Sequence, residues 1–235
     1  VSIMGEMGRA YDGSYAEYVL LPNEQIYPVD SQLPWSEIAA VPETYYTAFG
    51  SFKNMQIKEG DSILVRAVTS GVGLAFLKLV KAQFPQNRIV GAVRSLAKKD
   101  LLQHQGFDEI ILNERGVLQT EEKFDKILEL VGPATLKNSF DHIQSAGIIC
   151  NTGQLGGKWY VEEFDPIVEI KNNSFLTSFY SGNVSQQLID ELFSYIDAYQ
   201  INVSPQRIFS LEQIPAAHSY IESQVGFGKV VILND

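Results

Sequence analysis

The sequence predicts an α/β protein that contains a doubly wound, mostly parallel β-sheet. Three observations support this fold class. Between residues 63 and 199, apolar runs of strand type alternate with patterns of helical length. The first run, Ile63–Val65, turns through the small residues of 69–73 into an apolar helix. Short strand-like segments and turns occupy both ends of the chain, outside this alternation.

Short extended segments are expected before the alternation begins. Residues 14–21 and 25–29 mix aromatic and aliphatic residues at strand-like spacing, and Pro22 separates the two segments. A short helix over 36–40 precedes a longer helix over 44–52. This N-terminal part therefore differs in style from the region that follows it.

The central region supplies the sheet and its helices. Strands that alternate with helices of about 10–15 residues form parallel βαβ units. Such a sheet binds its ligand at the carboxyl ends of the strands. The expected strands cover 63–65, 88–93, 109–112, 126–131, 147–150 and 175–180, and the expected helices cover 72–83, 96–105, 134–143 and 186–199.

The C-terminal tail returns to the style of the N-terminal part. A helix over 214–223 leads to a closing strand over 230–233. We expect residues 1–45 and 204–235 to pack together as one small domain, and residues 46–203 to form the α/β domain.

Composition and charge exclude several classes of function. The chain has 235 residues, of which 45% are apolar, and a net charge of −10. This acidic balance argues against binding to nucleic acid or to an anionic membrane surface. A single cysteine, Cys150, rules out an intrachain disulfide and a four-thiolate zinc site within this sequence.

The sequence also bears on location. No apolar run approaches the roughly 18 residues that a membrane-spanning helix needs, and no signal-peptide pattern opens the chain. A cytoplasmic location is the default interpretation. The chain begins at Val1 without an initiator methionine, which suggests a fragment of a longer protein.

The small-residue turn after the first strand is a candidate phosphate site. A helix that starts directly after a buried strand presents main-chain N–H groups and its dipole to a pyrophosphate. Thr69, Ser70, Gly71, Val72 and Gly73 are the candidate residues. Only part of the G-x-G-x-x-G dinucleotide pattern is literal, so the alternative is a turn that merely lets a helix pack on a strand.

The end of the second strand favours NADP over NAD. NAD sites place a carboxylate about 20 residues after the glycine turn, to bind the ribose 2′-hydroxyl. Here Arg94 and Ser95 stand at that point, with Lys98 one turn later. An arginine, a hydroxyl and a lysine suit a 2′-phosphate. The alternative is an exposed arginine followed by a serine that caps a helix.

Several motifs occur together in a familiar order. They are Gly13-Ser14-Tyr15-Ala16-Glu17-Tyr18, Gly60-Asp61, Ser70-Gly71-Val72-Gly73-Leu74-Ala75 and Gly228-Lys229-Val230-Val231. In these motifs the chain resembles the medium-chain dehydrogenase/reductase superfamily, in its zinc-type alcohol dehydrogenase-like and NADPH:quinone oxidoreductase-like branch. The resemblance implies a Rossmann domain, part of a mostly-β GroES-like catalytic domain formed by both chain ends, and an N-terminal truncation.

The resemblance also implies site residues. It places Tyr46 and Thr47 near the nicotinamide or the substrate, and Asn113 beside the adenine. The turns after two later strands, with Val131, Gly132, Thr152 and Gly153, would line the nicotinamide ribose, and Phe227 and Lys229 would approach the cofactor from the tail. Turn chemistry and core packing are the alternatives for these residues. No metal ligands are expected, because His104, His142, His218 and Cys150 lack ligand spacing.

The resemblance implies an oxidoreductase that transfers a hydride from NADPH to a quinone or an α,β-unsaturated carbonyl without zinc. Tyr46 or Thr47 would polarise the substrate carbonyl. One alternative is a zinc-dependent alcohol dehydrogenase whose metal ligands lie in the missing part. Another is a non-enzymatic NADP-binding or interaction protein. A homodimer formed near residues 175–180 is expected by the same resemblance.

Overall fold

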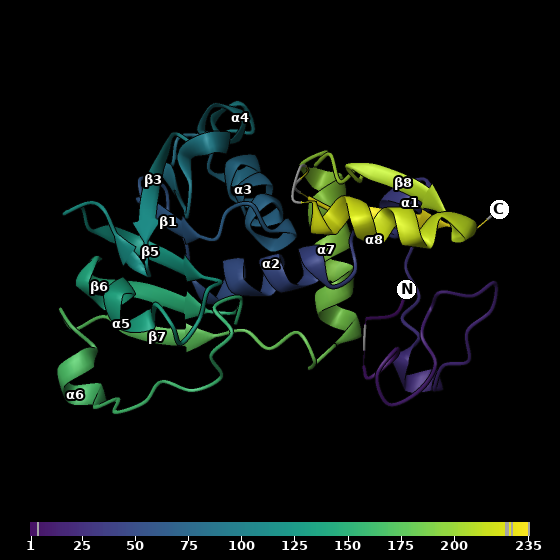
Figure 1. Cartoon of the computed structure of the whole chain (residues 1–235), viewed down its shortest axis with the longest axis horizontal. Helices are drawn as coiled ribbons and strands as arrows, with labels where there is room; N and C mark the ends of the chain where they lie inside the picture. Colours follow the sequence, from purple (N-terminus) through teal and green to yellow (C-terminus); the bar gives the residue numbers. More distant parts are fainter. Residues whose placement is uncertain (4, 224–225, 227, 235) are drawn as a thin grey trace. The chain divides into compact units, whose positions relative to one another are not determined.

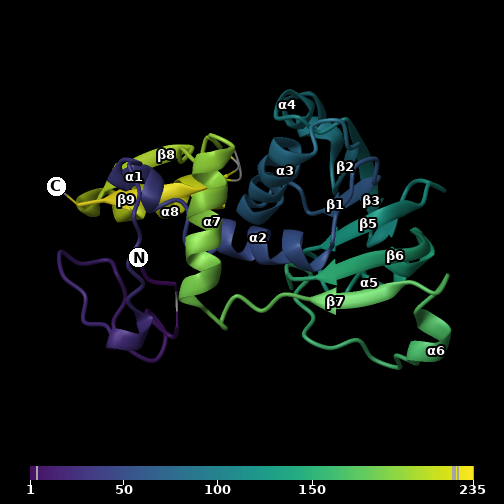
Figure 2. The same ribbon diagram turned by 180° about the vertical axis from the view of Figure 1, so that it is seen from behind.

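The computed structural model describes residues 1–3, 5–223, 226 and 228–234. The chain folds into two compact units. One unit contains Val1–Tyr46 and Ser181–Asp235, and the other contains Thr47–Tyr180. We call them the terminal unit and the sheet unit. Figures 1 and 2 show their elements from opposite sides.

The sheet unit contains a seven-stranded sheet in the order β4-β3-β2-β1-β5-β6-β7. All neighbours pair in parallel except β4, which pairs antiparallel with β3. The strand order reverses direction between β1 and β5, as in a Rossmann sheet. The strands are β1 (Ile63–Arg66), β2 (Ile89–Val93), β3 (Glu109–Glu114), β4 (Val117–Leu118), β5 (Phe124–Glu129), β6 (Ile143–Asn151) and β7 (Phe175–Ser178).

The predicted α/β fold with a doubly wound parallel sheet is therefore confirmed. The helices between the strands are α3 (Gly71–Gln83), the 3-10 turn η2 (Leu96–Lys98) with α4 (Lys99–His104), α5 (Leu136–Asp141) and α6 (Pro166–Glu169). Helix α2 (Thr44–Asn54) precedes β1 in the sequence. Short β4 and α6 were not predicted, because segments of two and four residues carry no periodic pattern.

The centre of the sheet is buried because β1 and β2 are mostly apolar on both faces. Every residue of β1 and β2 is buried. Leu64 shares a hydrophobic core with Ile127 of β5 and with Leu136 and Phe140 of α5. Since side chains alternate along a strand, Ile63 and Val65 point to the opposite face. Both views show α3 beside β1 (Figures 1 and 2).

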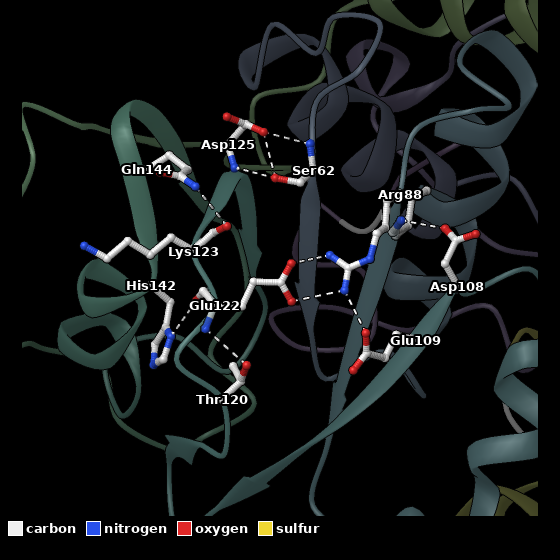
Figure 3. Close-up of polar contacts among 11 residues, drawn as sticks. Ser62, Arg88, Asp108, Glu109, Thr120, Glu122, Lys123, Asp125, His142 and Gln144 are labelled. Atoms are coloured by element: carbon white, nitrogen blue, oxygen red, sulfur yellow. Dashed lines mark hydrogen bonds and ion pairs between the residues drawn. The ribbon is translucent and has the colours of Figure 1, made fainter.

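Polar side chains connect the loops at the amino-terminal edge of the sheet (Figure 3). Arg88 forms ion pairs with Glu109, at 2.7 Å, and with Glu122. The Asp125 carboxylate accepts hydrogen bonds from the main-chain N–H and hydroxyl of Ser62, at 2.8 and 2.7 Å. Exposed pairs of this kind contribute at most about 1 kcal/mol each. These contacts hold together the amino-terminal edge of the sheet, which is the edge opposite to the carboxyl ends of the strands.

The terminal unit is less regular. It contains η1 (Asn23–Gln25), α1 (Trp35–Ile38), α7 (Gln186–Ala198), β8 (Arg207–Ser210), η3 (Leu211–Gln213), α8 (Ile214–Glu222) and β9 (Val230–Leu233). Strands β8 and β9 form a parallel two-stranded sheet, and α8 connects them. The closing strand over 230–233 and the helix over 214–223 agree with the sequence prediction.

The strand predicted over residues 14–21 is wrong. These residues form no strand, and Tyr18 and Leu20 are exposed. A strand needs a pairing partner, and no described segment pairs with them. The assignment of 1–45 and 204–235 to a GroES-like domain stays a prediction. Among the described helices, none is both long enough and apolar enough to cross a membrane.

Candidate functional site

The turn between β1 and α3 is built for close approach of helix and strand. Ser70 caps the helix, because its hydroxyl accepts a hydrogen bond from the Gly73 N–H at 3.1 Å. A Cβ at Gly73 would lie 3.0 Å from Val68 Cα and 3.1 Å from Val68 O. Gly73 is buried, Ser70, Gly71 and Val72 are partly buried, and Thr69 is exposed. The first N–H groups of such a helix lack intrahelical acceptors and suit an anion.

Polar residues follow the next strand, β2. Arg94 and Ser95 are exposed, and Lys98 is partly buried in η2. The Ser95 hydroxyl accepts a hydrogen bond from the Ala97 N–H at 3.3 Å, so it caps η2. The structure therefore agrees with the alternative in which Ser95 caps the following helical turn. A serine hydroxyl that accepts one bond still has a proton to donate to a ligand.

Asn113 lies in β3, near its carboxyl end. The residue is only 6% exposed, and its side-chain carbonyl oxygen has no hydrogen-bond partner among the described residues. A buried acceptor without a partner costs free energy. The oxygen could therefore accept a hydrogen bond from a ligand amino group.

The turns after β5 and β6 are interlocked. Gly132 has a φ of +88°, and a Cβ there would lie 2.3 Å from the Gly153 carbonyl oxygen. A Cβ at Gly153 would lie 2.2 Å from the Leu130 carbonyl oxygen. The Gly156 N–H donates to the Val131 carbonyl at 2.8 Å. The two turns therefore behave as one rigid piece, which includes the candidate residues Val131, Gly132, Thr152 and Gly153.

A buried ion pair joins the last residues of β1 and β5. It was not predicted from the sequence. Arg66 and Glu129 both have side chains that are 0% exposed, and Arg66 Nε lies 3.6 Å from Glu129 Oε2. Burial lowers the pKa of Arg66, and the charge of Glu129 opposes that shift. Both residues are charged and lie within otherwise apolar runs, 63–68 and 127–131, which is the signal that could have revealed them.

A chain of hydroxyl groups links α2 to β6. Ser51 donates to the Thr47 carbonyl at 2.8 Å, so Thr152 donates to Ser51 across 2.9 Å. Cys150 Sγ lies 3.3 Å from Thr152 Oγ1, and burial raises the pKa of the Cys150 thiol. The Thr47 hydroxyl is buried and has no hydrogen-bond partner among the described residues. Of these hydroxyls, only that of Thr47 is left for a substrate.

The other candidate residues belong to the terminal unit. The Tyr46 hydroxyl donates to the Asn183 carbonyl at 3.0 Å and accepts from the Ser185 N–H at 3.1 Å. The Lys229 ammonium donates to the Thr44 hydroxyl at 3.2 Å. Burial lowers the pKa of Lys229, and the nearby Glu43 carboxylate opposes the shift. Phe227 lies outside the described residues.

The structure brings most of the predicted residues to one edge of the sheet. Strands β1, β2, β3, β5 and β6 are parallel, so their carboxyl ends lie on the same edge. That edge carries the β1–α3 turn, Arg94, Asn113 and the interlocked turns. Within the described part of the chain, no group of three or more His, Cys, Asp or Glu side chains could hold a metal ion. These residues therefore do not fit a zinc site.

Comparison with known proteins identifies the family. The chain is 24% identical over 235 residues to a probable quinone oxidoreductase of Schizosaccharomyces pombe, covering 94% of this chain and 70% of that protein. It superposes on the Bacillus subtilis protein yhfP with NAD bound (TM-score 0.80, 21% identity, 99% of this chain and 73% of that one). It also superposes on mycobacterial Rv1454c complexed with NADPH (TM-score 0.75, 22% identity, 94% and 73%).

The chain spans between 8% and 70% of the length of three curated relatives that it matches. The sequence profile described as zinc-binding dehydrogenase matches residues 105–232, which is more than half of the chain. The protein therefore belongs to the zinc-binding dehydrogenase family, within the medium-chain dehydrogenase/reductase superfamily.

Proposed function

We propose that this protein is an NADPH-dependent oxidoreductase that reduces a quinone or an α,β-unsaturated carbonyl without zinc. One observation carries the proposal. The Ser70-capped turn at the end of β1 offers a pyrophosphate site, and the neighbouring strand ends at exposed Arg94, with no carboxylate at that point. This arrangement suits a dinucleotide with a 2′-phosphate.

The choice of NADPH depends on Arg94. Among the similar structures, yhfP was solved with NAD and Rv1454c with NADPH, so structural likeness favours neither coenzyme. Arg94, Ser95 and Lys98 would hold the 2′-phosphate, and Asn113 would accept a hydrogen bond on the adenine side. Val131, Gly132, Thr152 and Gly153 would lie around the nicotinamide half. Bound NADPH would supply the hydride.

The protein would then contribute a polar group for the substrate carbonyl. Thr47 suits this role, because its buried hydroxyl has no partner among the described residues. The Tyr46 hydroxyl proton is already donated to Asn183, so Tyr46 would position α2. A buried donor aimed at a developing oxyanion stabilises it more than water does. We also propose that the protein forms a homodimer, which light scattering would test. Residues 1–45 and 204–235 would form part of a GroES-like catalytic domain.

Coenzyme binding is the first test. NADPH and NADH are titrated by their fluorescence against the wild type, Arg94→Ala and Lys123→Ala. Lys123 is exposed at the amino-terminal edge of the sheet, so its variant controls for the loss of one positive charge. We expect Arg94→Ala to weaken NADPH binding about tenfold, as for the loss of one charge-assisted contact. Equal binding of NADPH and NADH by the wild type would contradict the proposal.

Turnover and metal content form the second test. The full-length protein is assayed for NADPH oxidation with a set of quinones and enones, and its zinc content is measured. We expect turnover with at least one of these classes and no stoichiometric zinc. Stoichiometric zinc would favour a zinc-dependent alcohol dehydrogenase. Absence of binding to either coenzyme would favour an interaction protein.

A further inference from the structure

Glu129 accepts hydrogen bonds from both interlocked turns, through its side chain from the turn after β5 and through its main-chain carbonyl from the turn after β6. Its Oε1 accepts hydrogen bonds from the N–H groups of Val131, at 2.8 Å, and Gly132, at 3.0 Å. Its main-chain carbonyl accepts from the N–H groups of Thr152, at 3.0 Å, and Gly153, at 3.2 Å. One residue therefore fixes the main chain of all four candidate residues on this side of the site.

Arg66 holds the Glu129 carboxylate in place. The second carboxylate oxygen, Oε2, accepts from the Ser139 hydroxyl at 2.6 Å and faces Arg66. The guanidinium donates in turn to the Ser139 hydroxyl, at 3.0 Å, and to the Gly116 carbonyl, at 2.9 Å. A fully buried carboxylate needs such a counter-charge and such donors. Its position is therefore determined from β1, from α5 and from the β3–β4 turn.

The Arg66–Glu129 pair lies between β1 and β5, where the order of the strands in the sheet changes direction. Arg66 ends β1 and Glu129 ends β5, and the strand order reverses between these two neighbours. Ligands of open α/β sheets bind above that point. The proposed phosphate sites lie over β1 and β2. The other half of a dinucleotide must then lie over β5 and β6, above the turns that Glu129 holds.

We propose that Glu129 is a positioning residue for the nicotinamide half of the coenzyme, and that Arg66 is its counter-charge. This inference rests on the proposed coenzyme-binding function. Glu129 does not touch the ligand. It fixes the turns after β5 and β6, and the close Gly132–Gly153 approach transmits any displacement of one turn to the other.

If the Arg66–Glu129 pair served stability alone, its replacement would leave coenzyme binding unchanged. Replacement of a buried ion pair by apolar residues of similar size is often neutral for stability. The apolar pair would nevertheless leave the Val131 and Gly132 N–H groups without their acceptor. Stability and coenzyme binding can therefore be separated by choosing the right variants.

The test uses two variants of the full chain and one control. Glu129→Asp keeps the charge but shortens the side chain, so the carboxylate no longer reaches the turn. Arg66→Met with Glu129→Met removes both charges together and keeps the experiment possible if Glu129→Asp does not fold. The control, Lys126→Met, changes a 7% exposed lysine on the same strand, which pairs with Asp61 near the amino-terminal edge.

Two ligands are titrated by calorimetry, well below each variant's unfolding temperature. NADPH probes the whole site, and 2′,5′-ADP probes only its adenine half. We expect both Glu129 variants to bind NADPH about tenfold more weakly, which corresponds to about 1.4 kcal/mol. Their binding of 2′,5′-ADP should match the wild type, and Lys126→Met should bind both ligands normally. Amide exchange at Val131 and Gly132 should also become faster in both Glu129 variants without ligand.

The outcomes are distinguishable. If the wild type binds neither ligand, the proposed function fails and this inference fails with it. If the wild type binds both, the inference alone is overturned when the Glu129 variants bind NADPH normally. It is also overturned when they lose NADPH and 2′,5′-ADP equally, because a general loss of structure would produce that result.

Discussion

The ammonium group of Lys229 donates a hydrogen bond to the hydroxyl of Thr44, and the Glu43 carboxylate lies nearby. Burial lowers the pKa of Lys229 below the ordinary value of 10.5, to which the unfolded chain returns. Between the two values the unfolded state binds more protons than the folded state. The free energy of unfolding should therefore rise with pH in that window, and the cost of burying the charge is fully present below it.

Substitution Lys229→Met should flatten this rise. Urea unfolding of the wild type and the variant, from neutral pH to 10.5, measures the difference. The control is Lys123→Met, which removes one ammonium from an exposed position of the sheet unit and should leave the rise with pH in place. Parallel curves for the wild type and Lys229→Met would show that burial of Lys229 does not control the pH dependence.

Gly73→Ala should damage the β1–α3 turn. The added Cβ would meet the main chain of Val68, which cannot rotate away. We expect a loss of about 1–3 kcal/mol in stability and weaker NADPH binding, measured by urea unfolding and fluorescence titration.

Gly91→Ala is the matched control for Gly73→Ala. Its Cβ would also be crowded, but by the side-chain ends of Ile110 and Val68, which can change rotamer. A smaller loss of stability is expected, with normal coenzyme binding. Equal effects of the two substitutions would mean that main-chain contact at Gly73 is not the limiting feature.

Thr47→Val and Tyr46→Phe should have opposite effects. The Thr47 hydroxyl is buried and has no partner within the described part of the chain, so its replacement by a methyl group should preserve or raise stability while lowering kcat. Tyr46→Phe removes hydrogen bonds to Asn183 and Ser185, which should cost about 1 kcal/mol with little change in kcat. Thermal unfolding and NADPH turnover measure both. An active Thr47→Val variant would exclude Thr47 as the group that polarises the substrate.

The Cys150 thiol should be unreactive in the folded protein. Burial raises its pKa, so the reactive thiolate is scarce at neutral pH, and the side chain is inaccessible. Labelling with an aromatic disulfide reagent should be slow in the native state and fast in urea. Rapid native labelling would indicate that the chain of hydroxyls around Thr152 opens readily.

The sheet was predictable because its signals are local. The apolar run at 63–65 and the capped helix at 72–83 each carry their own periodicity, and their alternation determines a parallel sheet. The segment 14–21 misled the prediction, since alternation is necessary for a strand but pairing depends on distant residues. Strand β8 at Arg207–Ser210 was not predicted for the converse reason, because it is largely exposed and, among the described strands, pairs with β9 alone.

The candidate site likewise contains residues that local sequence identifies and residues that only distant contacts identify. The turn at Ser70–Gly73 and the exposed Arg94 could be singled out from neighbouring residues alone. The role inferred for Glu129 could not, because it depends on bonds to two turns and on an arginine from another strand. A charged residue within an apolar run indicates a constraint, but only the fold shows which groups impose it.

The buried Arg66–Glu129 pair has an evolutionary consequence. Loss of either partner leaves the other charge unpaired in the interior, whereas loss of both can be nearly neutral for stability although it removes the acceptor of the Val131 and Gly132 N–H groups. The two positions should therefore be epistatic, and a lineage should rarely pass through either single substitution. Across related sequences that bind the coenzyme, the residues at 66 and 129 are expected to be retained together, as Arg with an acid, and two uncharged residues are expected only where coenzyme binding has been lost.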